Sequence, residues 1–82
     1  SVLIADDDAL VRGVLRMALT RAGYAVVEAR DAVEVIAAAA AHAPDLVVLD
    51  INMPGGTVHD TLGSLRDHTP DLPVLVLSGE SH

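Results

Sequence analysis

The chain has 82 residues, enough for one small domain, and its 51% apolar content argues against an intrinsically disordered segment. A formal net charge of −7, with five arginines and no lysine, argues against nucleic-acid binding through this segment, because phosphate neutralisation needs a basic face. The sequence has no cysteine, which removes disulfides and thiolate chemistry, and no apolar run of membrane-spanning length, so we expect a cytoplasmic protein with no membrane contact.

The first predicted strand is the apolar run Val2–Ala5, whose lack of polar positions is typical of a strand covered by helices on both faces. Three acids, Asp6, Asp7 and Asp8, follow it directly. Asp8 is placed to cap a helix over about residues 9–22, with Gly23 as its stop signal. Apolar residues at helical spacing form its predicted packing face, with the arginines elsewhere: Leu10, Val11, Val14, Leu15, Ala18 and Leu19.

A second strand is predicted over residues 24–28, followed by a second helix. Residues 31–34 resemble a capping box, with Asp31 in the place of the usual Ser or Thr and Glu34 at its third helical position. The alanine run that follows favours helix, and Pro44 ends it.

The third predicted strand, residues 46–49, ends in Asp50. Residues 53–56 predict a loop, and a weaker helix follows over roughly residues 58–67. Pro73 introduces a fourth apolar strand, Val74–Leu77, which ends at Ser78 and Gly79.

This alternation of strands and helices predicts a parallel sheet with right-handed crossovers. Asp6, Asp7 and Asp50 then gather at the carboxyl edge of the sheet, where open α/β folds bind their ligands. Several carboxylates at one site need a cation, and all-oxygen ligation favours Mg²⁺.

The pattern of these motifs resembles the receiver domain of bacterial two-component response regulators. The resemblance covers the whole chain and rests on the acids after the first strand, Asp50 ending the third, Met53-Pro54 beyond it, and Ser78-Gly79 ending the fourth. It implies a flavodoxin-like three-layer αβα sandwich, with a parallel sheet in the order 2-1-3-4. The family's fifth strand is absent from this chain.

The resemblance also implies a role for each site residue. Asp50 would be the phosphoacceptor for a phosphohistidine on a sensor histidine kinase or phosphotransfer protein. Asp6, Asp7, Asp50 and the backbone carbonyl of Asn52 would hold Mg²⁺, and Ser78 would be the hydroxyl that contacts the phosphoryl group during switching. Asp8 is interpreted as a helix cap. The protein would be a signalling switch rather than an enzyme in the ordinary sense, acting at most on its own phosphorylation.

The chain departs from the family pattern at its end. Residues 1–82 are interpreted as a partial receiver domain that lacks the final helix-strand-helix portion, which carries the family's lysine. An output domain would lie outside this segment. Strand Val74–Leu77 would be left as an uncovered edge, so we expect a homodimer, exchange of elements between copies, or a longer polypeptide.

Two other functions remain open from the sequence. One is a Mg²⁺-dependent phosphohydrolase with an aspartate nucleophile, although such enzymes usually carry a second acid where this chain has Asn52. The other is a receiver-like interaction module that never carries phosphate.

Overall fold

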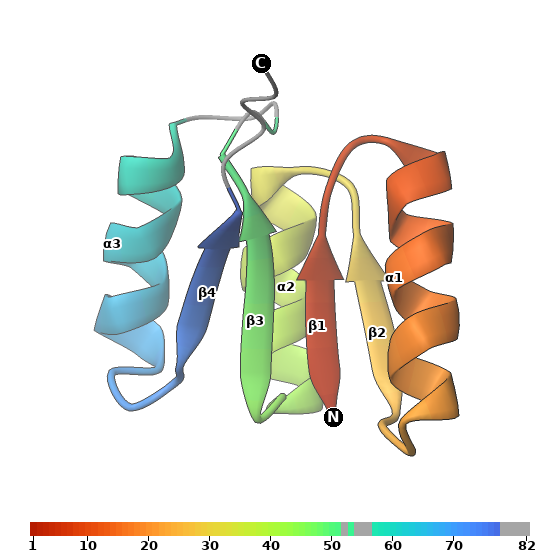
Figure 1. Ribbon diagram of the computed structural model, residues 1–82. Coiled ribbons are helices and arrows are strands. Elements are labelled where there is room, and N and C mark those ends of the chain that lie inside the picture. The colour runs from red at the N-terminus through yellow and green to blue at the C-terminus, as the bar shows by residue number, and fades with distance from the viewer. Residues whose placement is uncertain (52, 54–56, 78–82) are drawn as a thin grey trace.

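The computed structural model describes residues 1–51, 53 and 57–77. Strands and helices alternate along this part of the chain, as predicted (Figure 1). The elements are β1 (Val2–Ala5), α1 (Ala9–Arg21), β2 (Val26–Ala29), α2 (Ala32–His42), β3 (Leu46–Asp50), α3 (Val58–His68) and β4 (Val74–Leu77). No helix in these ranges is long and apolar enough to cross a bilayer.

The four strands form one parallel sheet in the order β2-β1-β3-β4, which confirms the predicted fold class. β1 and β3 are the central strands and pair with each other from Val2 opposite Leu46 to Ala5 opposite Leu49. Their carboxyl ends therefore lie side by side, at the top of Figure 1. This register brings the acids that follow β1 next to the acid that ends β3.

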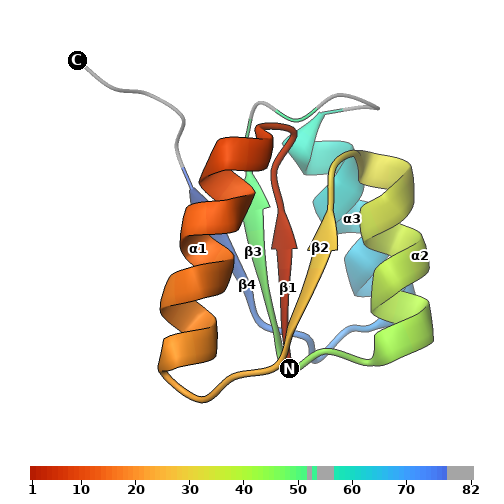
Figure 2. The ribbon, with the colours of Figure 1, turned by 90° about the vertical axis from the view of Figure 1, so that its right-hand side faces the viewer.

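The sheet is the middle of three layers, with α1 on one side and α2 and α3 on the other (Figure 2). Side chains alternate between two apolar cores because neighbouring residues of a strand point to opposite faces. The larger core, beneath α2 and α3, includes Leu3, Val35, Val47, Leu49 and Leu65. The smaller core, on the α1 side, is formed by Val2, Ile4 and Val48, with Leu15 and Leu19 packed against it.

The predicted apolar face of α1 is only partly covered. Leu15 and Leu19 pack on the sheet, but Leu10 and Val14 are exposed, at 76% and 60%. The reason is that α1 contacts β1 and β2 and has no helical neighbour on its side among the described residues. One helix lying on a sheet buries a narrower stripe than the six residues that the sequence pattern predicts.

The second strand begins two residues later than predicted, at Val26 instead of residue 24. Gly23 has a φ of 98°, a left-handed conformation that glycine adopts without steric cost. This turn directs the N–H of Tyr24 to the carbonyl of Leu19, 3.0 Å away. Tyr24 therefore closes the end of α1 and does not belong to the strand.

The start of α2 follows the predicted cap with one change. Asp31 is the N-cap residue and accepts a hydrogen bond from the N–H of Glu34 at 2.8 Å. The carboxylate of Glu34 reaches back to the N–H of Arg30, at 2.9 Å, one residue before the N–H used in a standard capping box. Arg30 also donates from Nε to the second oxygen of Glu34, at 3.2 Å.

Replacing this cap should have a modest and specific effect on stability. We expect Asp31→Ala to lower the free energy of unfolding by about 1 kcal/mol, because the N–H of Glu34 loses its acceptor. Asp31→Asn keeps a side-chain oxygen at the same place and should cost less. Urea denaturation of the two variants provides the comparison, and an equal loss in both would show that charge, not the cap hydrogen bond, is what matters.

Candidate phosphoacceptor and metal site

Two hydrogen bonds fix the loop after β1 and hold Asp6, its first residue, at the carboxyl edge of the sheet. The N–H of Asp6 donates to the carbonyl of Ala29 at 3.1 Å, which extends the β1–β2 ladder by one residue. The carboxylate of Asp6 accepts the N–H of Asp8 at 2.9 Å. Asp6 is consequently 7% exposed, whereas Asp7, between these contacts, is exposed to solvent.

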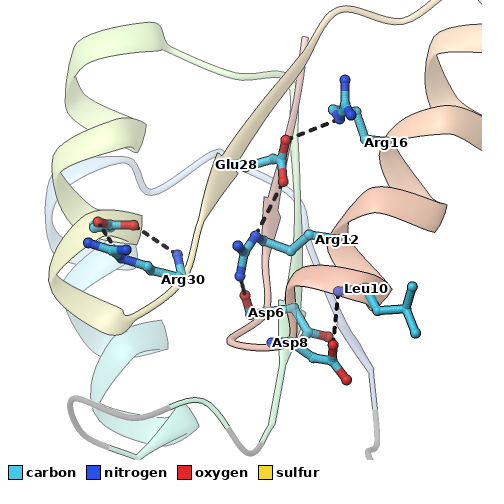
Figure 3. A network of polar contacts seen from close by, with 8 residues as sticks. Asp6, Asp8, Leu10, Arg12, Arg16, Glu28 and Arg30 are labelled. Carbon is cyan, nitrogen blue, oxygen red and sulfur yellow. Dashed lines mark hydrogen bonds and ion pairs between the residues drawn. The ribbon is translucent and has the colours of Figure 1, made fainter.

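Asp8 has the capping role that the sequence predicts. Its backbone is extended, and its carboxylate accepts the N–H of Leu10 at 2.9 Å, at the start of α1 (Figure 3). One of the unpaired amides of the first helical turn is thereby satisfied.

Asp50 is the last residue of β3 and is half-buried. It pairs in register with Leu77 of β4, and the next N–H, of Ile51, donates to the carbonyl of Leu77 at 3.1 Å. These contacts hold the end of β3 against β4, while β1 pairs with β3 up to Leu49, the residue before Asp50. The backbone that carries Asp50 is therefore part of the sheet and not of the loop that follows it.

The structure brings Asp6, Asp7 and Asp50 together, as predicted. Each offers a carboxylate oxygen, and these three atoms all lie within 4.8 Å of one another. Ligands on opposite sides of an octahedral Mg²⁺ are roughly 4.2 Å apart, so carboxylates this close together could share one such cation. The all-oxygen donor set fits a hard cation.

Asp6 carries the electrostatic cost of this arrangement. The pKa of its carboxyl lies above the ordinary value of 3.8, chiefly because burial disfavours the charged form. The neighbouring carboxylates, Asp50 foremost, raise the pKa further, and the hydrogen bond from the N–H of Asp8 opposes the shift. A cation between these groups would offset both the burial and the repulsion.

The raised pKa predicts how stability depends on pH. Because folding raises the pKa of Asp6, its ionisation opposes folding, and the free energy of unfolding should fall as the pH rises from 3.8 through the higher folded value. Asp6→Asn, which keeps an oxygen for the N–H of Asp8, should therefore be more stable than wild type at neutral pH without metal. This advantage should vanish at acid pH, where Asp6 is protonated.

Urea denaturation in a chelator, from acid to neutral pH, measures this difference. Asp71→Asn, which replaces an exposed acid in the turn before β4, is the control for removing a negative charge and should not reproduce the gain of Asp6→Asn. If the free energies of unfolding of Asp6→Asn and wild type differed by the same amount at every pH, the ionisation of Asp6 would not be what opposes folding.

Two predicted site residues, Asn52 and Ser78, lie outside the described residues, as does Gly79. His42, His59 and His68 are exposed and take no part in this cluster of acids.

One residue near the site was missed. The helical pattern predicts Arg12 to be a surface arginine, but its side chain is 16% exposed and donates a hydrogen bond to the carbonyl of Asp6. Two signals in the sequence could have indicated this. Arg12 lies three residues before Leu15, on the packed side of the helix, and Glu28 follows Val26 by two residues and so lies on the sheet face that α1 covers.

The comparison with protein families matches residues 2–82 to the response regulator receiver domain. The chain therefore belongs to this family. It is 44% identical over 81 residues to the DNA-binding transcriptional regulator NtrC of Rhizobium meliloti, covering 99% of this chain and 17% of that protein. It spans 34% of the length of the mycobacterial regulators TcrX and MprA.

Solved structures agree with this membership. The response regulator TrrA of Thermotoga maritima, solved in complex with Mg²⁺ and BeF, superposes with a TM-score of 0.90 at 31% identity, over 99% of this chain and 70% of that one. A response regulator from Burkholderia pseudomallei, solved with a phosphorylated aspartic acid and a calcium ion, gives a TM-score of 0.88 at 30% identity, over 98% and 47%.

Proposed function

We propose that this chain is the signal-receiving part of a two-component regulator and accepts a phosphoryl group on Asp50 in a Mg²⁺-dependent reaction. The observation that carries the proposal is the meeting of Asp6, Asp7 and Asp50 at the carboxyl edge of the sheet, with oxygen atoms within 4.8 Å of one another. Family membership supports it, as does the presence of a phosphorylated aspartate in one structural relative and Mg²⁺ in another.

Asp50 is suited to be the nucleophile because its backbone is held at the end of a central strand while its side chain is only half-buried. In the proposed step, a carboxylate oxygen of Asp50 bonds to phosphorus as the phosphorus–nitrogen bond of a phosphohistidine breaks. The imidazole leaves, and its nitrogen takes up a proton from solvent. The products are an aspartyl phosphate and a neutral histidine on the donor.

The proposed metal ligands are Asp6, Asp7, Asp50 and the backbone carbonyl of Asn52. When bound, Mg²⁺ supplies positive charge between the carboxylate and the phosphoryl oxygens, which reduces their repulsion. The protein holds these carboxylates in place before the cation binds. The carboxylate of Asp6 accepts the N–H of Asp8, and the N–H of Asp6 donates to the carbonyl of Ala29 on β2. Little further ordering of this side chain is therefore needed when a cation binds.

The donor and the output follow from the same proposal. The donor is a phosphohistidine of a sensor kinase or phosphotransfer protein, and Ser78 is the proposed hydroxyl through which phosphorylation alters the sheet edge. The curated relatives are transcriptional regulators several times longer than this chain. An output domain, including any DNA-binding surface, is therefore proposed to lie outside this acidic segment.

Family membership favours this signalling role over a phosphohydrolase, and we propose that any catalysis is limited to the chain's own phosphorylation and dephosphorylation. The third possibility, an interaction module without phosphate, retains no specific support from the described site, because all three carboxylates are present and converge.

Mg²⁺ binding tests the site. At a concentration about 100 times the dissociation constant, Mg²⁺ should raise the free energy of unfolding of the full-length protein by about 2.7 kcal/mol. Asp7→Asn should remove this gain, because the exposed Asp7 contributes a ligand but no core packing. Asp67→Asn, an exposed acid on α3, should retain it. An equal Mg²⁺ effect in wild type and Asp7→Asn would rule out the proposed ligand set.

A further inference from the structure

Arg12 differs from the other arginines in its surroundings. Its side chain is 16% exposed, against 56% for Arg16 on the next turn of α1 and 71% for Arg30. Figure 3 shows it extending from α1 toward the end of β1, between Glu28 and the Asp6 backbone. A guanidinium this well covered needs its polar contacts satisfied, and those contacts define what it does.

The first contact is with the loop that carries the acids. Nη1 of Arg12 donates a hydrogen bond to the backbone carbonyl of Asp6 at 2.7 Å. The N–H of Asp6 is already bound to Ala29 on β2. Both backbone groups of Asp6 are thus fixed, which sets the plane of the peptide bond that leads to Asp7.

The second contact orients the guanidinium. Nε of Arg12 lies 3.2 Å from one carboxylate oxygen of Glu28, and Nε of Arg16 lies 3.2 Å from the other oxygen. Glu28 belongs to β2 and pairs in register with Ile4 of β1. Arg12 therefore connects α1, β2 and the loop after β1 through one side chain.

We propose that Arg12 is a positioning residue for the metal site, fixing the backbone between Asp6 and Asp7 through the Asp6 carbonyl while Glu28 orients its guanidinium. This inference rests on the proposed function. The proposed role of Arg12 follows from a difference in how Asp6 and Asp7 are held. Asp6 is buried and hydrogen-bonded through its own carboxylate, whereas the side chain of Asp7 is exposed, so its place depends on the backbone that carries it.

A residue that holds a ligand-bearing loop acts on metal affinity by reducing the ordering that binding requires. A purely structural clamp would act differently. It would lower the stability of the metal-free and metal-bound protein equally and leave the dissociation constant for Mg²⁺ unchanged. The two roles are therefore separated by measuring affinity, not stability.

The chain offers a matched pair for this test. Arg12→Met and Arg16→Met each remove one ion pair with Glu28, but only Arg12→Met removes the hydrogen bond to the Asp6 carbonyl. Isothermal titration of the full-length protein with Mg²⁺ should show the dissociation constant raised about tenfold in Arg12→Met, the effect typical of losing a residue that supports a metal ligand. Arg16→Met should match wild type.

Arg12→Lys extends the test if the methionine variant fails to fold. Lysine keeps a donor for the carbonyl but lacks the planar fork that also reaches Glu28, so this variant should bind Mg²⁺ less tightly than wild type and more tightly than a folded Arg12→Met protein. Equal affinities in wild type and every folded Arg12 variant would overturn the inference alone, as would equal losses in Arg12→Met and Arg16→Met. Absence of Mg²⁺ binding by wild type would overturn the proposed function itself.

Discussion

Asp50→Asn should reduce phosphorylation of the full-length protein by a small acyl phosphate to background. The change preserves the size of the side chain and the β3 backbone, but an amide is no nucleophile toward phosphorus and carries no charge for Mg²⁺. The reaction should need Mg²⁺ in wild type, because the attacking carboxylate and the phosphoryl oxygens are all anionic. Labelling is followed by the change in mass of the intact protein.

Asp45→Asn is the matched control. Asp45 precedes β3 at the opposite end of the same strand, is 84% exposed, and contacts the N-terminal amine of Ser1. It should be labelled like wild type. Undiminished labelling of Asp50→Asn would contradict the choice of nucleophile, and loss of labelling in both variants would point to a general effect of removing acids.

The isolated 82-residue chain should self-associate. β4 pairs with β3 alone within the described part of the chain, so it is an edge strand, and its Leu75 is 52% exposed on the side of the sheet that α1 covers elsewhere. The exposed Leu10, Val14 and Met17 of α1 add apolar surface on the same side. Unpaired backbone groups beside apolar side chains favour strand pairing with a second copy.

Analytical ultracentrifugation across a range of concentrations measures this association. Leu75→Lys should shift the chain toward monomer, because a charge at the edge of a sheet opposes edge-to-edge pairing. Val33→Lys is the control: Val33 is 73% exposed but lies on α2, on the other side of the sheet, and should not reduce association. If the wild-type chain were instead a monomer that melts cooperatively at high concentration, the exposed edge of β4 would not drive association.

The sheet and the meeting of the three acids could be predicted because both depend on strand ends. Continuous apolar runs mark buried strands, and the carboxyl ends of parallel strands share one edge, which places Asp6, Asp7 and Asp50 at that edge. Their meeting also requires β1 and β3 to be neighbours, as the strand order implied by the family resemblance has them. The caps Asp8 and Asp31 were equally local, since each binds an N–H within three residues. Their effects could be worked out without knowing any tertiary contact.

Arg12 and the packing of α1 could not be predicted in the same way, because both depend on tertiary neighbours. Helical spacing alone gives a face, and the extent to which that face is covered is decided by what packs beside the helix. Arg12 lies at the border of that face. Its side chain packs toward the sheet because Glu28 and the backbone carbonyl of Asp6 bind its guanidinium there. Such a pairing joins α1, β1 and β2 across the fold.

The central claim, that Asp50 is the phosphoacceptor, is tested most directly by locating the phosphoryl group in the wild-type protein. After reaction with a small acyl phosphate and Mg²⁺, reduction of the acyl phosphate and peptide mass spectrometry should place the modification on Asp50 at the end of β3. A phosphoryl group found instead on Ser78 or on one of the histidines would contradict the account.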